Sequence, residues 1–299
     1  MIVLVVGSTG LVGGNVALQL QREGHQVLAF CRDGRKNPKV QPLLQAGIKL
    51  VEGDLTDPES LRAACSGVET VITTATSMPS GANDGLRRVD RDGTLSLIDA
   101  AVHQNVRRFI YTSYSGNIEE GCLLKVAKRD CEAALFASPI QTVILRPSFF
   151  MEVWLSPALG FDPVAGTVRI YGSGREKVSY VSAFDVASFA AAAVTRRYPE
   201  EKTILEIGGP EPQSQLDATL LFEQALGKEI KTEYISLESL QAQLQSADPL
   251  QKTFAALALN YAQGDVVADA VAHAKAHQLN LTSVSDYASG FHARAAVAS

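Results

Sequence analysis

The stretch that most constrains the fold is the first twenty-one residues, which read as a strand, a glycine-rich turn and a helix. Residues 2–6 form an unbroken apolar run, the pattern of a parallel strand buried on both faces. Gly7, Gly10 and Gly13 follow at GxxGxxG spacing. Such a turn exposes bare backbone at a helix N-terminus, where unpaired N–H groups and the helix dipole favour an anion.

We therefore expect a dinucleotide site at this turn, with a glycine turn that serves close packing alone as the alternative. The hydroxyl groups of Ser8 and Thr9 would add hydrogen-bond donors to those of the backbone. The expected contacts come from Gly7, Ser8, Thr9, Gly10, Leu11, Val12 and Gly13.

Strands and helices alternate along the first half of the chain, which predicts a doubly wound parallel α/β sheet. The further strands are expected at 26–30, 48–52, 70–74, 108–113 and 142–145. We expect residues 1–150 to form the cofactor domain, with 182–209 returning to it, and 151–181 and 210–299 to form a smaller, mainly helical lobe. Helices are predicted in that lobe at 214–226, 236–245, 249–262, 265–277 and 283–293.

Composition excludes several classes of protein. With 299 residues, 46% of them hydrophobic, the chain can bury one large core or one core with a smaller lobe. A net charge of −5 without a Lys/Arg stripe argues against nucleic acid as a partner.

The candidate metal ligands form no site pattern. The cysteines are scattered, and His273 and His277 lack the flanking carboxylate of an HExxH arrangement, so we expect no metal site. No apolar run reaches the ~18–20 residues of a membrane span, and no signal peptide fits before the first strand, so we expect a soluble cytoplasmic protein.

The end of the second expected strand carries the residues that read the adenosine ribose in such folds. Arg32 ends this strand, with Arg35 and Lys36 close behind, which favours the 2′-phosphate of NADP(H) over NAD(H). Asp33 stands one residue later and keeps NAD(H) open. A solvated basic loop is the further alternative.

Two more strand ends contribute to the expected site. Asp54, followed by Leu55, comes directly after the third strand, where its carboxylate could accept a hydrogen bond from the adenine amine or serve only as a loop residue. Thr74, Ala75 and Thr76 follow the fourth strand and would lie against the ribose and pyrophosphate.

Several segments together resemble a known family. They are GSTGLVG (7–13), EGDLTDPESL (52–61), VDRDGT (89–94), RRFIYTSYSG (107–116), AKRDCEAAL (127–135), VILRPSFFME (143–152), SYVSAFDVA (179–187) and LEIGGPE (205–211). The set resembles the short-chain dehydrogenase/reductase superfamily, specifically its atypical NmrA-like branch with isoflavone-reductase-like and quinone-reductase-like members. The resemblance implies a Rossmann fold that binds NADP.

Dehydrogenases of this superfamily use a serine, a tyrosine and a lysine, the last two at YxxxK spacing on one helix. Lys128 matches the lysine, but Leu124 occupies the tyrosine position, so the usual proton-transfer set is broken. Tyr114 aligns with the serine, between Ser113 and Ser115. Lys128 is then a ribose ligand, an acid that acts on substrate or water, or a solvated helix lysine. Tyr114 is the second candidate catalytic residue, or else an aromatic wall of the pocket.

The resemblance also implies a nicotinamide and substrate region after the sixth strand. Main-chain groups of Pro147, Ser148 and Phe149 would lie beside the nicotinamide. Phe150, Met151, Trp154 and Phe161 would form an apolar substrate wall, or else ordinary core.

Three functions remain open from the sequence. The first is an NADPH-dependent reductase of a small apolar carbonyl, enone or quinone, favoured by the aromatic wall and the helical lobe. The second is a non-catalytic NADP(H) redox sensor that acts through a protein partner, favoured by Leu124. The third is a sugar-nucleotide epimerase-like enzyme that retains NAD, which Leu124 and Arg32 weaken.

Overall fold

The computed structural model describes residues 1–78, 84–118 and 121–298, and the backbone but not the side chains of 292–298. The chain divides into two compact units. The first comprises Met1–Tyr114, Leu123–Arg146 and Val186–Leu205, and the second comprises Ser115–Cys122, Pro147–Asp185 and Glu206–Ser299.

A seven-stranded sheet forms the centre of the first unit. Its strands, in spatial order, are β10 (Lys202–Ile207), β6 (Gln141–Pro147), β5 (Arg108–Thr112), β4 (Thr70–Thr73), β1 (Ile2–Val6), β2 (Gln26–Cys31) and β3 (Lys49–Glu52). β1 pairs in parallel with β2 on one side and with β4 on the other, so the strand order reverses at β1. The predicted doubly wound sheet is confirmed, and its ligand crevice is expected at this switch point.

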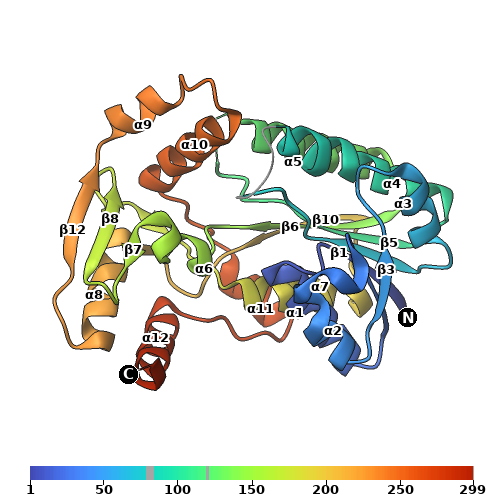
Figure 1. The fold of residues 1–299 in the computed structure, drawn as a ribbon, viewed down its shortest axis with the longest axis horizontal. Helices are drawn as coiled ribbons and strands as arrows, with labels where there is room; N and C mark the ends of the chain where they lie inside the picture. Colours follow the sequence, from blue (N-terminus) through green and yellow to red (C-terminus); the bar gives the residue numbers. More distant parts are fainter. Residues whose placement is uncertain (79–83, 119–120, 299) are drawn as a thin grey trace. The chain divides into compact units, whose positions relative to one another are not determined.

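Helices cover both faces of this sheet (Figure 1). One face carries α1 (Leu11–Arg22), α2 (Gln41–Gln45) and α7 (Ala183–Thr195), and the other carries α3 (Pro58–Cys65), α4 (Thr94–His103) and α5 (Leu123–Ala137). Short turns η1 (Gly34–Lys36) and η2 (Pro38–Val40) follow β2. Asp57 caps α3, because its carboxylate accepts the Glu59 N–H at 3.0 Å and Pro58 opens the first turn.

A hydrophobic core cluster lies between the sheet and the helices α3, α4 and α5. It includes Leu4, Phe30 and Phe109 from the strands, with Leu97 and Leu135 from the helices. Alternate apolar residues of each strand supply this face, as expected for strands covered on both sides. The cluster holds the carboxyl ends of β1, β2, β4 and β5 at one edge of the sheet.

A π-helical turn, η3 (Leu86–Gly93), precedes α4. Its wide coil brings backbone groups close together at Gly93. A Cβ on Gly93 would lie 2.9 Å from the Leu55 Cβ and 3.0 Å from the Arg88 carbonyl oxygen. Asp90 accepts hydrogen bonds from the Ser77 N–H at 2.9 Å and hydroxyl at 2.7 Å. Because these contacts are long-range, helical periodicity alone could not predict the π geometry.

The second unit is mainly helical, as predicted, with small sheets. Its strands are β7 (Phe161–Asp162), β8 (Thr167–Tyr171), β9 (Lys177–Val178), β11 (Gln213–Ser214) and β12 (Lys231–Ile235). Its helices are α6 (Met151–Trp154), α8 (Gln215–Leu226), α9 (Leu237–Gln243), α10 (Pro249–Gln263), α11 (Ala270–Ala276) and α12 (Val284–Ala298), with the turn η4 (Pro157–Leu159).

Two sequence predictions in this unit were wrong. β12 was missed; it pairs in parallel with β8 in the order β12-β8-β7. The helix predicted over 265–277 begins only at Ala270, because Asp265 forms a β-bridge with Val178 and its N–H donates to the Lys177 carbonyl at 2.9 Å. Both errors arise from strand pairing across long stretches of chain.

Candidate functional site

The glycine turn between β1 and α1 is closely packed against the end of β4. Gly7 has a φ of +86°, a conformation that glycine adopts without strain. A Cβ on Gly7 would lie 2.8 Å from the Ala75 nitrogen, and one on Gly13 would lie 2.3 Å from the Gly7 carbonyl oxygen. No larger residue fits at Gly7 or Gly13 without displacing the backbone of the turn. The close packing and the bare turn surface therefore arise from the same glycines.

The N-terminus of α1 presents backbone donors at this turn. Gly10 is the exposed N-cap and supplies no side-chain hydrogen bond, so the first N–H groups of the helix are available to an anion. The Ser8 hydroxyl is not available in the way the sequence suggested. It is buried and donates to the Phe30 carbonyl at 3.0 Å, which ties the turn to β2. Thr9 is half-buried and Leu11 is 48% exposed.

The end of β2 presents the predicted positive charge. Arg32, Arg35 and Lys36 are all exposed, on the short segment that leads into and through η1. Asp33, the residue that kept NAD(H) open, adopts a left-handed φ of 60° and is also exposed. Three cations within five residues suit a dianionic phosphate better than a ribose hydroxyl.

Asp54 and Leu55 follow β3. One Asp54 carboxylate oxygen accepts both the N–H and the hydroxyl of Thr56 at 2.8 Å, while Leu55 is buried. Burial would raise the pKa of the Asp54 carboxyl, but the two bonds from Thr56 hold that pKa below its usual value. The nearby guanidinium groups of Arg32 and Arg88 also lower the pKa of Asp54. Arg88, from η3, was not a predicted site residue.

Lys128 lies on α5 and is only 6% exposed. Its ammonium donates to the Thr112 carbonyl at 3.0 Å, and its Nζ is 5.1 Å from the centroid of the Tyr111 ring. Burial lowers the pKa of Lys128, while the negative charge of Asp90 acts in the opposite direction. Lys128 is therefore a buried, oriented lysine and not a solvated one.

Two buried polar atoms beside this lysine have no protein partner. The Thr112 hydroxyl and the Oδ1 oxygen of Asp90 both lack a hydrogen bond within the described chain. Buried polar atoms rarely stay unpaired in the functional state of a protein. Both atoms are thus candidates to bond a bound ligand or water.

The residues around the missing tyrosine are apolar or already engaged. Leu124, one helical turn before Lys128, is 9% exposed and places hydrocarbon where the family's tyrosine would stand. The Arg129 guanidinium lies 5.1 Å from the Tyr114 ring, and it donates to the Ser113 hydroxyl and the Tyr114 carbonyl at 3.3 Å each. Tyr114 thus belongs to the first unit with Lys128, stacked beside an arginine.

Ser115 belongs to the second unit, where its hydroxyl donates to Asp265 at 2.8 Å. Asn117 donates to the same carboxylate oxygen at 2.8 Å. These bonds secure the segment that follows β5 to the loop before α11. Ser115 is therefore engaged in structure.

The expected nicotinamide and substrate residues also belong to the second unit, and they lie in a packed aromatic cluster. Phe149 meets Trp154 edge-on at a centroid distance of 4.9 Å, and the Trp154 ring lies 4.3 Å from that of Tyr261. Tyr261 on α10 shares a buried hydrogen bond with the Tyr180 hydroxyl. Pro147, Ser148, Phe149, Met151 and Trp154 are buried, and Phe150 is half-buried.

Tyr261 and Tyr180 were missed by sequence reasoning. Their only signal is an aromatic residue within an apolar stretch, which ordinary core residues share. The sequence left open whether Met151 and Trp154 line a substrate pocket or belong to the ordinary core. Their side chains are 0% and 7% exposed, which agrees with a place in the core.

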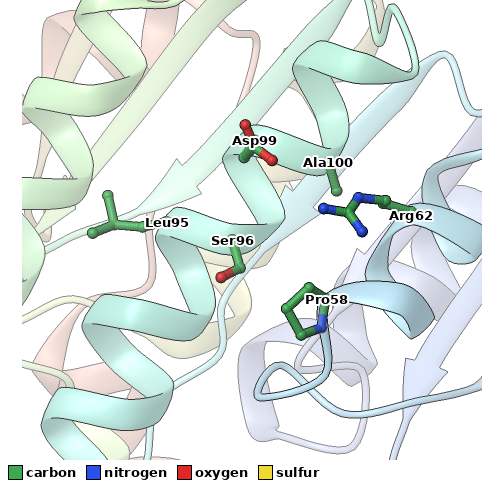
Figure 2. A pocket seen from close by; sticks show the side chains of 6 residues that line it. All are labelled: Pro58, Arg62, Leu95, Ser96, Asp99 and Ala100. Atoms are coloured by element: carbon green, nitrogen blue, oxygen red, sulfur yellow. The ribbon is translucent and has the colours of Figure 1, made fainter.

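Other features of the structure lie apart from the predicted residues. A surface hollow of about 340 Å³ lies between α3 and α4, lined by Pro58, Arg62, Leu95, Ser96, Asp99 and Ala100 (Figure 2). None of these is a predicted site residue. The Nδ1–H of His273 donates to the Glu206 carbonyl at 2.8 Å, and the Nδ1–H of His277 donates to the His273 carbonyl at 2.7 Å. Residues 1–78, 84–118 and 121–298 contain no group of three potential metal ligands. Within the same ranges, no helix has both the length and the apolarity of a membrane span.

A doubly wound seven-stranded sheet with a glycine turn at its first strand–helix junction defines a Rossmann-type α/β protein. The profile of the NmrA-like family matches residues 1–288, and the chain belongs to this family. The resemblance seen in the sequence is thereby confirmed.

Individual relatives span most of the chain. The photosystem II assembly factor Ycf39 of Trieres chinensis is 32% identical over 243 residues, which cover 79% of this chain and 73% of the relative. The isoflavone reductase homolog IRL of Zea mays is 28% identical over 82% of this chain and 81% of its own. The NADPH-dependent quinone oxidoreductase of Escherichia coli, solved with NADPH, superposes with a TM-score of 0.79 at 22% identity, covering 97% of this chain and 99% of that one.

Proposed function

We propose that this protein binds NADP(H) through its first unit. The glycine turn and the α1 N-terminus would take the pyrophosphate, and the Arg32 segment would take the 2′-phosphate. Arg35 and Lys36 would add charge at that end. Similarity to the Escherichia coli oxidoreductase, whose structure contains NADPH, supports this choice.

We further propose that the protein is an NADPH-dependent reductase of a small apolar carbonyl, enone or quinone. The observation that carries this proposal is the buried Lys128 ammonium, held by the Thr112 carbonyl at 3.0 Å. Reduction of such a substrate needs one hydride, which NADPH supplies when bound, and one proton. Lys128 would donate the proton and regain it from solvent. Its lowered pKa makes the ammonium a better acid near neutral pH than an exposed lysine.

The remaining polar groups of this region would orient the reacting molecules. Lys128 would also hold the cofactor ribose, because its remaining ammonium protons can donate to hydroxyl groups. The unpartnered Thr112 hydroxyl would accept or donate one bond to a bound molecule.

A second candidate is a non-catalytic NADP(H)-binding factor that acts through a protein partner. Leu124 favours it, since leucine cannot transfer a proton where the dehydrogenases of the superfamily use tyrosine. The 32% identity to an assembly factor also supports this candidate. An epimerase-like enzyme, the third function, would purify with NAD already bound.

The first test is calorimetric titration with NADP+, NADPH, NAD+ and NADH, followed by NADPH oxidation with quinones, enones and aldehydes. The reductase proposal expects preferential NADP(H) binding and turnover with one of these substrate classes. Arg32→Ala should weaken NADP(H) binding much more than NAD(H) binding. Equal loss for both would refute the 2′-phosphate assignment.

The role of Lys128 is tested against a neighbour on the same helix face. Lys128→Ala should lower kcat/KM by about 100-fold or more, as expected for loss of a general acid. Leu124→Ala, an equally buried position, should lower it less. Similar losses would remove the special role of Lys128. Tight NADP(H) binding without turnover across the panel would reject the reductase in favour of the sensor.

A further inference from the structure

The π-helical turn η3 is attached at two points to segments expected to contact the nucleotide. At its end, Gly93 lets the turn approach Leu55 so closely that an added Cβ would lie 2.9 Å from both the Leu55 Cβ and its carbonyl oxygen. At its middle, Asp90 holds Ser77, one residue beyond the expected contacts after β4, through two hydrogen bonds. The turn is thus part of the carboxyl edge of the sheet where the cofactor is expected.

Arg88 lies on this turn in a position suited to a ligand. Its carbonyl oxygen would lie 3.0 Å from a Cβ on Gly93, so Arg88 stands one π-helical turn before the glycine that packs on Leu55. Its side chain is 59% exposed, and its guanidinium forms an ion pair with Asp84 at 3.5 Å. An exposed pair of this length contributes little, so the guanidinium can be re-aimed at low cost.

The charge of Arg88 acts on Asp54, one of the predicted site residues. Arg88 and Arg32 both lower the pKa of the Asp54 carboxyl, which shows that the two guanidinium groups lie within electrostatic range of the same carboxylate. Arg32 comes from the end of β2, whereas Arg88 comes from the turn that packs on Leu55. The two arginines thus approach Asp54 from different elements of the first unit.

We propose that Arg88 is a cofactor-binding residue whose guanidinium stacks on the adenine base that Asp54 hydrogen-bonds. The inference rests on the proposed NADP(H) site. An adenine role is favoured over a phosphate role because η3 packs against the segment expected to contact the base, while the 2′-phosphate is expected at Arg32, directly after β2. A planar guanidinium stacks well on aromatic rings and needs no anionic partner to do so.

The test measures binding of NADP+ and NAD+ to Arg88→Ala by calorimetry. Stacking predicts that affinity for both dinucleotides falls by the same factor, between about 5-fold and 30-fold. The matched control is Arg87→Ala, which removes the same charge from the same turn. Arg87 is 80% exposed, and its nearest acidic partner is Asp92 at 3.8 Å. This control should change either affinity by less than about twofold.

A double substitution separates the base from the phosphate. In the Arg32→Ala background, Arg88→Ala should lower NADP+ affinity by the same factor as in the unsubstituted protein, because the two residues bind different parts of the molecule. The thermal midpoint without cofactor should match that of Arg87→Ala, which excludes a folding defect.

Two results would overturn the inference. One is an Arg88→Ala protein that binds both dinucleotides as well as the Arg87→Ala control. The other is a loss confined to NADP+ that disappears in the Arg32→Ala background, which would make Arg88 a phosphate ligand. If the unsubstituted protein binds neither dinucleotide, the proposed function itself fails, and that outcome is distinct from both.

Discussion

Replacing Gly13 by alanine tests whether the glycine turn is as tightly packed as the structure indicates. The added methyl group would lie 2.3 Å from the Gly7 carbonyl oxygen and 2.6 Å from the Thr74 hydroxyl oxygen. Both distances are well inside van der Waals contact, and the first involves backbone that cannot rotate away. The turn must therefore move as a whole, away from β4.

The expected cost follows from two opposing effects. Overpacking of this kind costs about 1–3 kcal/mol, whereas replacing a helical glycine by alanine gains up to about 1 kcal/mol. Gly13→Ala should thus lower the free energy of unfolding of the first unit by about 1–2 kcal/mol. Since the displaced turn also carries the α1 N-terminus, NADP+ affinity should fall by more than about tenfold.

Gly14→Ala is the matched control, one residue further along α1. Its Cβ would lie 3.2 Å from the Ser8 carbonyl oxygen, a contact that needs only a small shift. Its free energy of unfolding should stay within about 0.5 kcal/mol of the unsubstituted protein, because a small steric cost is offset by the helix propensity of alanine. Urea unfolding measures the stability of the two variants, and calorimetric titration measures their NADP+ affinity. Similar values for Gly13→Ala and Gly14→Ala would refute the close packing inferred for the turn.

Two further predictions concern stability. The Lys202 ammonium donates to three main-chain carbonyls at and after the end of α5, at 2.6–2.8 Å. Lys202→Met should therefore lower the free energy of unfolding, measured by urea denaturation, by about 2–3 kcal/mol. An unchanged urea midpoint would contradict a stabilising role for these hydrogen bonds. Hydrogen bonds from Lys177 and Ser214 lower the pKa of Asp217 to about 2, so its carboxylate stabilises the folded state above pH ~4 and loses this effect as the pH falls through 2. Asp217→Asn should remove this loss of unfolding free energy between pH 4 and 2, which is worth less than about 1 kcal/mol because the side chain is partly exposed. A variant whose stability falls as steeply between pH 4 and 2 as that of the unsubstituted protein would contradict this role of Asp217.

Local pattern accounts for most of the first unit. The apolar run of β1 and the spacing of Gly7, Gly10 and Gly13 predict a strand, a turn and a helix from neighbouring residues alone. The cap of α3, Asp57 before Pro58, is likewise a pattern of neighbouring residues. The alternation of such elements then predicts a doubly wound sheet, because parallel strands need helical crossovers. The basic residues at the end of β2 were likewise evident as a local charge pattern.

The sequence determined less where contacts join distant segments. Lys128 could be solvated or buried on its helix, and only the packing of α5 on β5, which brings its ammonium to Thr112, decides between them. β12 was missed because five residues of weak alternation become a strand only beside β8. The apolar wall predicted around Trp154 becomes a closed aromatic cluster once α10 contributes Tyr261.

Arg88 is the clearest case of a residue whose context only tertiary structure supplies. In the sequence it is one of two adjacent arginines, and no spacing rule separates it from Arg87. Their surroundings in the fold distinguish them, because Gly93 packs on Leu55 one turn after Arg88 and the charge of Arg88 lowers the pKa of Asp54. Periodicity and turn chemistry are properties of neighbouring residues, so the sequence alone determined the class of fold and predicts where a phosphate would bind. Burial and proximity depend on segments far apart in the chain, so only the tertiary structure decided the surroundings of Lys128 and Arg88.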